Sequence, residues 1–386
     1  MNDVEYRKAN ENDYYDVVDL IDLVFSQTYS SNYSDKNLPV IYKKKNFMAG
    51  IHYLAKENGR LVGSISSYPA IYALCDERIK VSSISCVAVH RRARSKGYMR
   101  KLMEMAINEM RENGTDLSFL HGQRQRYEYY EYTHCGVQLH FSCTSDNIRH
   151  YFKHTSGSTI SLKELQENDV ETYDKIYHIY HKRKDHIIRP YDIFEDIMNT
   201  WGDKTIGIYQ NETLIGYLSS SMDYGSIVEF NLNDLTLIGD VLKIYFTQFK
   251  RDKVIIEAFS PDTELISCLS KFTESVSIVN AGSFNVLNYP AVLTAFLKLK
   301  CETTVLPDGF VTINIQNKCN IKIEINGNVP SVSLTNEKPD LECSHLEAMQ
   351  LLFSPVSFIT LGQFRDNAFL RSIIPIPLFI RRNDLS

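Results

Sequence analysis

Hydrophobic positions in the first 120 residues switch repeatedly between the spacing of a strand and the spacing of a helix. Short apolar runs rich in β-branched residues predict strands at 4–7, 52–55, 61–68, 83–89 and 117–120. Asn58-Gly59 is a hairpin signal between the second and third of these strands. Helical spacing predicts one helix that begins at Asn10 or Asn12 and ends near Phe25.

The helix expected at 98–113 has the most regular apolar stripe. The side chains that recur on one of its faces are Met99, Leu102, Met103, Ala106 and Met110. Gly114 supplies a stop signal directly after it. The strand at 83–89, the basic loop and this helix therefore form a predicted strand–loop–helix unit. We expect the apolar face of its helix to pack against a sheet.

The same order of signals occurs a second time. Glu11-Asn12-Asp13 precedes the first helix, and Glu167-Asn168-Asp169 precedes a helix expected at 169–182. Residues 58–63 (NGRLVG) are likewise matched by 211–216 (NETLIG). Because both pairs of landmarks occur in the same order at nearly the same spacing, they predict a duplicated α/β unit.

The pattern changes again near residue 283. A short helix is expected at 290–300, and alternating positions then predict strands at 309–315, 321–325 and 331–334, with Asn326-Gly327 as a hairpin turn. A capping box at 344–347 opens a helix to 353. This region reads as a separate α+β domain, and the apolar segment 373–380 near the end of the sequence is expected to dock in a groove.

Composition places the chain among ordinary globular proteins and removes several classes of function. The chain is 44% apolar and 23% charged, and its net charge of −5 argues against a nucleic-acid partner. Its eight cysteines form no CxxC pair, which argues against a zinc framework and a disulfide scaffold. His178, His181 and His186 invite a metal site, but the charged residues around them favour a solvated helix face, so no metal is expected. With no long apolar run and no signal peptide, we expect a cytoplasmic protein without a membrane partner.

The loop between strand 83–89 and the helix at 98–113 is a candidate anion site. A helix N-terminus presents free backbone N–H groups and the positive end of its dipole. Arg92, Arg94, Lys96 and Arg100 add positive charge there, and Gly97 permits close approach of a ligand. This basic loop (residues 91–100) predicts a pyrophosphate site, with a solvated basic turn as the alternative. The second copy has no glycine or basic residue at the equivalent 229–235, so we interpret it as structural.

Val87-Ala88-Val89 followed by Arg94-x-x-Gly97-x-Met99 resembles the acetyl-CoA motif of GNAT N-acetyltransferases. More narrowly, the whole chain is similar to the Eis (enhanced intracellular survival) family. That resemblance implies an α/β fold with two tandem GNAT domains, of which the second is degenerate, and a C-terminal α+β domain of sterol-carrier-protein type. The implied boundaries are 1–147 for the catalytic domain, 148–288 for the degenerate one and 289–386 for the last.

The resemblance also implies roles for individual residues. Acetyl-CoA would be the donor, held by Val87, Ala88, Val89, Arg92, Arg94, Ser95, Lys96, Gly97, Tyr98 and Met99. In the aromatic segment 127–132 (YEYYEY), Tyr127 matches the general acid of the family, with Tyr129 and Tyr130 as alternative registers. The terminal carboxylate, here that of Ser386, would be the general base. No covalent enzyme intermediate is then needed.

The activity that these expectations describe is acetyl transfer to amino groups of a cationic small molecule, with aminoglycosides as the acceptors that the family suggests. Acetylation of protein lysines is an alternative, and so is a non-catalytic protein that binds acyl-CoA or a lipid. Glu128, Glu131 and Asp384 are candidates for an acidic acceptor pocket, and Arg381 and Arg382 could lower a nearby carboxyl pKa or repel a cation. The resemblance further implies a homo-oligomer, a hexamer.

Overall fold

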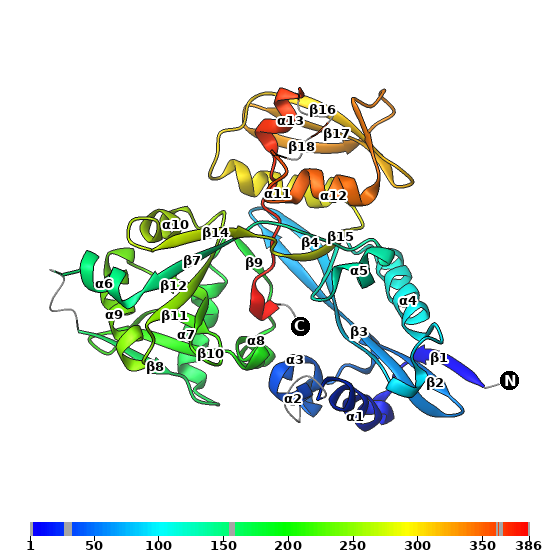
Figure 1. Cartoon of the computed structure of the whole chain (residues 1–386), viewed down its shortest axis with the longest axis horizontal. Coiled ribbons are helices and arrows are strands. Elements are labelled where there is room, and N and C mark those ends of the chain that lie inside the picture. Colours follow the sequence, from blue (N-terminus) through cyan, green and yellow to red (C-terminus); the bar gives the residue numbers. More distant parts are fainter. Residues whose placement is uncertain (1–2, 27–32, 154–158, 360–361, 363–365, 385–386) are drawn as a thin grey trace.

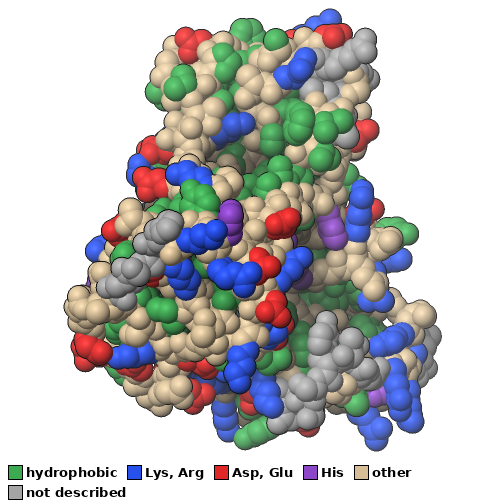
Figure 2. Space-filling model, turned by 60° about the vertical axis from the view of Figure 1, so that its left-hand side comes forward, with side chains coloured by type: hydrophobic (Ala, Val, Ile, Leu, Met, Phe, Trp, Pro, Cys, Tyr) green, Lys and Arg blue, Asp and Glu red, His purple; other side chains and the backbone are tan. Residues whose placement is uncertain are grey.

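The computed structural model describes residues 3–26, 33–153, 159–359, 362 and 366–384, which form three β-sheets with helices packed on them (Figure 1). Every strand and helix expected from the pattern is present, and most end within a few residues of the predicted positions. The strands expected at 61–68 and 83–89 are longer, Arg60–Leu74 and Glu77–Val89. Among the described residues, no helix is both long and apolar enough to cross a bilayer. On the face shown in Figure 2, acidic and basic side chains are interspersed with hydrophobic ones.

The first sheet contains all five strands predicted in the first 120 residues. Its order is β1-β2-β3-β4-β5-β15-β6, and β9 pairs with β3. The strands are β1 (Val4–Lys8), β2 (His52–Glu57), β3 (Arg60–Leu74), β4 (Glu77–Val89), β5 (Leu117–Leu120), β6 (Thr133–Cys135), β9 (Asp185–Ile187) and β15 (Gly282–Val286). The helices of this part are α1 (Tyr14–Phe25), α2 (Tyr33–Asn37), α3 (Pro39–Tyr42), α4 (Tyr98–Glu112) and α5 (Arg124–Tyr127). The predicted apolar stripe of α4 is confirmed, because Leu102, Met103, Ala106 and Met110 are buried in one core cluster.

The second sheet repeats the succession of the first. Its order is β14-β7-β13-β12-β11-β10-β8. The strands are β7 (Gln138–Thr144), β8 (Ile160–Glu164), β10 (Lys204–Gln210), β11 (Thr213–Ser220), β12 (Ser226–Leu232), β13 (Lys253–Phe259) and β14 (Ser275–Val279). The helices are α6 (Ser145–Tyr151), α7 (Val170–Tyr180), α8 (Phe194–Met198), α9 (Ile238–Gln248) and α10 (Thr263–Leu269). Each of these two sheets has one parallel pair among antiparallel neighbours. The pair is β4 with β5 in the first sheet and β12 with β13 in the second.

The two sheets exchange strands. β7 follows the first sheet in sequence but pairs with β13 and β14 of the second. β15 follows the second sheet but pairs with β5 and β6 of the first. β9 also lies between β8 and β10 in sequence but pairs with β3 of the first sheet. The chain therefore crosses between the two sheets four times, which ties the two parts together.

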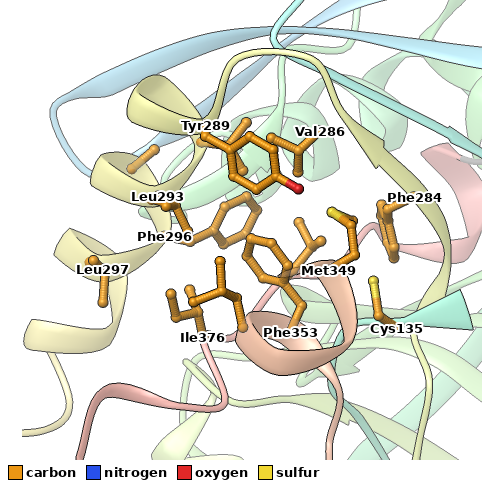
Figure 3. Close-up of a cluster of buried hydrophobic side chains, with 14 of the residues drawn as sticks. Cys135, Phe284, Val286, Tyr289, Leu293, Phe296, Leu297, Met349, Phe353 and Ile376 are labelled. Carbon is orange, nitrogen blue, oxygen red and sulfur yellow. The ribbon is translucent and has the colours of Figure 1, made fainter. Parts of the chain in front are cut away.

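The third sheet has the order β18-β17-β16-β19. Its strands are β16 (Gly309–Ile315), β17 (Cys319–Asn326), β18 (Val329–Leu334) and β19 (Leu341–Cys343), with helices α11 (Tyr289–Cys301), α12 (His345–Phe353) and α13 (Ala368–Ile373). The predicted capping box of Ser344 and Glu347 is formed. Side chains of α11 and α12 meet Cys135 and Phe284 of the first sheet in one continuous core (Figure 3).

The last described segment passes from the third sheet down between the first two (Figure 1). Ile376, Leu378, Phe379 and Ile380 are buried, and the amide of Val137 donates to the carbonyl of Leu378 over 2.9 Å. The expected docking of 373–380 is therefore confirmed.

Candidate active site

A cavity of about 820 Å³ opens where the parallel strands β4 and β5 diverge. Their pairing runs from Val81 beside Leu117 to Ile84 beside Leu120 and ends there. Residues 83–87 of β4 line one side of the cavity, and residues 120–123 line the other. Because β5 ends at Leu120 while β4 continues to Val89, the end of their pairing leaves a ligand-sized opening between the two segments.

A bulge in β4 lies on the cavity wall. The pairing of β3 with β4 shifts between Ser64, opposite Ala88, and Ser66, opposite Ser85. Cys86 within the bulge has a φ of 47°, a left-handed value that is uncommon for a residue with a side chain. Of the predicted Val87-Ala88-Val89 strand, Val87 and Val89 line the cavity, whereas the Ala88 side chain is fully buried in the core on the other face.

The basic loop and the start of α4 close one end of the cavity. Arg94, Ser95, Gly97, Tyr98 and Met99 line it. Gly97 has a φ of 85° and, as the residue before α4, makes no side-chain cap to the first turn. The N–H groups of that first turn and the Arg94 guanidinium are donors available to an anion in the cavity, and the predicted pyrophosphate site stays a prediction.

Three of the four predicted basic residues of the loop, Arg92, Lys96 and Arg100, are not part of the lining. Lys96 lies outside it because its ammonium group forms an ion pair with Glu57, 2.8 Å away. Arg92 also lies outside, because it is on the short helical turn Arg91–Ala93, whose amide at Arg92 donates to the His90 imidazole over 3.2 Å. The turn exposes Arg92 to solvent and buries Ala93.

Tyr127 lies on the β5 side of the cavity. It ends α5, lines the cavity and is 9% exposed. Its ring packs on Gly122, where an added Cβ would lie 2.1 Å from the ring. Burial raises the pKa of the Tyr127 hydroxyl to about 12, so this phenol is protonated at neutral pH.

The other tyrosines of segment 127–132 are placed differently. Tyr129 is 86% exposed. Tyr132 is buried, with its hydroxyl 2.6 Å from that of Ser118. Neither these two nor Tyr130 belongs to the cavity lining. The geometry therefore brings Tyr127, among the tyrosines of this segment, to the divergent strands.

Another part of the cavity lining, contributed by other elements, is apolar and aromatic, and the sequence did not identify it. Val24, Phe25, Tyr33 and Leu38 line it from α1 and α2, and Trp201 reaches it from the region of the second sheet. The rings of Phe25 and Tyr33 are stacked with centroids 4.7 Å apart. The one available signal was that Trp201 is the only tryptophan of the chain and precedes a glycine.

The candidate acidic residues lie away from the cavity. Glu128 pairs with Arg124 over 2.5 Å, and Glu131 pairs with Arg111 and Lys318. Asp384 is bound by Arg189 over 2.7 Å. None of these three carboxylates therefore lines the cavity, whereas the His121 side chain does.

The segment 381–384 is held by ion pairs and hydrogen bonds to β9 of the first sheet, to the end of α8 and to the connection between α8 and β10. Arg381 pairs with Asp185, and Arg382 donates to Asp203 over 3.0 Å. Asn383 donates to the carbonyl of Met198 over 3.1 Å. The two arginines are thus engaged with carboxylates rather than directed into the cavity. Ser386 lies outside the described residues.

The histidine group at 178–186 is a set of ordinary helix and loop contacts. Nδ1 of His178 lies 2.8 Å from the Asp174 carbonyl, and that of His181 lies 2.9 Å from the Tyr177 carbonyl. Across the described parts of the chain, no group of three or more metal-ligating side chains gathers.

Comparison with known proteins agrees with this geometry. Residues 5–137 match the family described as an acetyltransferase (GNAT) domain. No curated protein matches the chain.

Three solved structures show the fold of the chain. A GCN5-related N-acetyltransferase from Anabaena variabilis is 14% identical with a TM-score of 0.69, and a probable N-acyltransferase from Enterococcus faecalis gives the same values; each alignment covers 98% of both chains. Eis1 from Mycobacterium abscessus is 12% identical with a TM-score of 0.63, again over 98% of both chains. At these identities the likeness concerns the fold alone. The chain is therefore an acetyltransferase with a GNAT domain in residues 5–137, and its acyl donor is acetyl-CoA.

Proposed function

We propose that this enzyme transfers the acetyl group of acetyl-CoA to an amino group of a small molecule by direct attack. The observation that carries the proposal is the single cavity that joins an anion-binding helix start, a divergent strand pair with Tyr127, and an apolar end that can hold an acceptor. Direct attack requires a held donor, a neutral amine and a proton for the leaving thiolate.

The lining fits the donor. Arg94 and the amides at the start of α4 provide positive charge and N–H groups for the pyrophosphate, and Gly97 lets it approach the backbone. The proposed contacts of Val87 and Val89 with the pantetheine arm follow from their position on the cavity wall. For Ala88, Arg92 and Lys96, only backbone or long-range contributions are proposed, because their side chains do not line the cavity.

The proposed chemistry assigns each proton. The amine nitrogen bonds to the acetyl carbon as the carbon–sulfur bond breaks. Tyr127 gives its hydroxyl proton to the departing sulfur, and the proton is available because the raised pKa keeps the phenol protonated. A base takes one proton from the nitrogen. The enzyme returns to its starting state when the base releases that proton to solvent and Tyr127 takes one proton from solvent.

For that base we propose the carboxylate of Ser386. The support is that residues 381–384 are fixed by ion pairs and hydrogen bonds beside the first sheet. A variant that ends at Asp384 keeps those contacts, so it should lose turnover but bind acetyl-CoA normally. Unchanged turnover in that variant would remove Ser386 from the mechanism.

The finer features of the proposal come from the resemblance to the Eis family. They are tandem GNAT domains at 1–147 and 148–288, a sterol-carrier-like domain at 289–386, a hexameric assembly, and aminoglycosides as acceptors. The repeated strand order of the first two sheets supports the tandem arrangement. Protein lysines are a second acceptor class to be tested.

A direct test combines calorimetric titration of the whole protein with acetyl-CoA and a mass-spectrometric screen of acceptor amines. The panel should include aminoglycosides, polyamines, simple aryl and alkyl amines and lysine peptides. Saturable binding with a product 42 Da heavier than one of the amines is the expected result. Binding without any acetylated amine would instead favour a non-catalytic acyl-CoA-binding protein.

A further inference from the structure

Trp201 brings a residue from the region of the second sheet into the cavity of the first. It lies in the short helical turn Thr200–Gly202, between α8 and β10. This turn packs against α2, beside the contact of α8 with α3 (Figure 1). A segment far along the sequence therefore completes the acceptor end of the site.

The backbone at Trp201 adopts a conformation that few bulky residues accept. Its φ is 63° and its ψ is 15°, in the left-handed region. Neighbouring bonds hold it there: the amide of Gly202 donates to the Asn199 carbonyl over 3.1 Å, and the hydroxyl of buried Thr200 donates to the Asp196 carbonyl over 3.2 Å. Such strain persists where the surroundings enforce it and is frequent at functional sites. Here it accompanies an indole on the cavity wall.

The surroundings of the indole are apolar. Phe25 and Tyr33 contribute stacked rings, and Val24 and Leu38 add aliphatic surface. Aromatic walls bind flat or apolar groups by burial and stacking, and Trp and Tyr faces also attract a single ammonium group.

The charge of the lining selects against a polycation. The described residues that line the cavity include Arg94 and Arg126 but no aspartate or glutamate. An aminoglycoside would lose the hydration of several ammonium groups beside arginines without gaining carboxylate partners, which is unfavourable.

We propose that the acceptor is a monoamine carried on an aromatic or apolar body, and that Trp201 determines this preference. The inference rests on the proposed acetyl transfer to amines and replaces the aminoglycoside as its preferred acceptor. The amine approaches the divergent strands while its body lies against Trp201 and Phe25. No change to the chemical step is involved.

Because Trp201 is the only tryptophan, its fluorescence reports acceptor binding without turnover. Titration of the whole protein with 2-phenylethylamine should give a saturable change, whereas kanamycin at the same ionic strength should give none. In the assay with acetyl-CoA, kcat/KM for 2-phenylethylamine should exceed that for kanamycin by roughly tenfold or more.

Variants of Trp201 separate specificity from folding. Trp201→Gly accepts the left-handed backbone but removes the ring, and should raise KM for 2-phenylethylamine roughly tenfold, with a small change in kcat. Trp201→Phe should recover most of that loss, and exposed Tyr151→Ala is the matched control. Both Trp201 variants should bind acetyl-CoA as the parent does, which verifies the fold.

Two results would overturn the inference: a higher kcat/KM for kanamycin, or an unchanged KM in Trp201→Gly. The proposed acetyl transfer survives either result, since an amine is still acetylated. If acetyl-CoA binds and no amine of any class is acetylated, the proposed function itself fails.

Discussion

Arg189 binds Asp384 through two hydrogen bonds, 2.7 Å from Nε and 3.0 Å from Nη2. The same guanidinium donates to Glu229 over 2.5 Å and lies 3.9 Å above the ring of Tyr180. The Arg189 side chain is fully buried, and the carboxylates of Glu229 and Asp384 are also buried. This single cation therefore neutralises part of the charge of two buried carboxylates. Residues around the second sheet thereby fix a segment nearly 200 positions later in the sequence.

Arg189→Met should lower the free energy of unfolding by about 3–5 kcal/mol, because it leaves Glu229 and Asp384 buried without a cation. Urea unfolding at pH 7 measures the loss. Arg149→Met is the control, since the pair of Arg149 with Asp146 is 2.8 Å long but highly exposed. Its effect should stay below about 1 kcal/mol. Equal losses in the two variants would contradict the assigned role of Arg189.

Two carboxylates near Arg382, those of half-buried Glu257 and buried Asp203, predict a pH dependence of stability. Burial raises the pKa of Glu257 to about 7 and that of Asp203 to about 6, against the opposing effect of Arg382; Gln138 also donates to Glu257. A carboxyl with a raised pKa in the folded state contributes stability at low pH, which is lost as the pH rises through that pKa. The two groups should therefore lower stability between about pH 4 and 7.

Glu257→Gln removes one of these groups while it keeps an oxygen that can accept from Gln138. It should stabilise the protein by about 1–3 kcal/mol at pH 8 and change little at pH 4. Thermal unfolding at the two pH values measures both effects, and the value at pH 4 is the internal control. A variant with the same gain at both values would show that titration is not the cause.

Tyr127→Phe should reduce kcat by about a hundredfold or more, because the leaving sulfur loses its proton donor. The affinity for acetyl-CoA should change little, since the ring still packs on Gly122. Tyr129→Phe is the matched control, because Tyr129 is exposed and outside the cavity lining. Steady-state kinetics and calorimetry together give both quantities. If Tyr127→Phe retains full activity, the acid must be sought elsewhere, with Tyr130 as the next candidate.

Sequence reasoning succeeded where the signal is local. The 3.6-residue stripe of α4, the Asn58-Gly59 turn and the capping box at Ser344 depend on neighbours within a few residues, and all three are formed. The apolar segment 373–380 was also predictable, because so many hydrophobic side chains require burial.

The missing parts depend on contacts between distant residues. Neither the place of Trp201 in the cavity lining nor the hydrogen bonds of Arg189 to Asp384 leave a pattern in the nearby sequence. The repeat identified residues 229–235 as the equivalent of the basic loop without its positive charge. It did not predict that Glu229 would be a hydrogen-bond partner of Arg189. Similarly, the basic loop was visible as charge, yet the pairing of Lys96 with Glu57 required the fold.

Gly97→Ala tests the anion-binding start of α4. Gly97 and Gly59 have φ values of 85° and 75°, and neither would bring an added Cβ within 4 Å of another atom. Each substitution should therefore cost about 1–2 kcal/mol of stability through backbone strain alone. Only Gly97→Ala should also weaken acetyl-CoA binding, by about tenfold, because its Cβ lies where the backbone must approach the phosphates. Equal acetyl-CoA affinities in the two variants would place the pyrophosphate elsewhere.

Arg94 and Arg92 offer the sharpest comparison, because they are two positions apart on the same loop and only Arg94 lines the cavity. Arg94→Gln removes a charged donor to phosphate, worth about 1.5–3 kcal/mol, so the Kd for acetyl-CoA should rise by about 10- to 100-fold. Arg92→Gln keeps the same net charge as Arg94→Gln and should change the Kd by less than about threefold, and less still at high salt. Calorimetry at two ionic strengths distinguishes a direct contact from a general field. If the two variants weaken binding equally and salt removes both effects, the loop acts only through its overall charge.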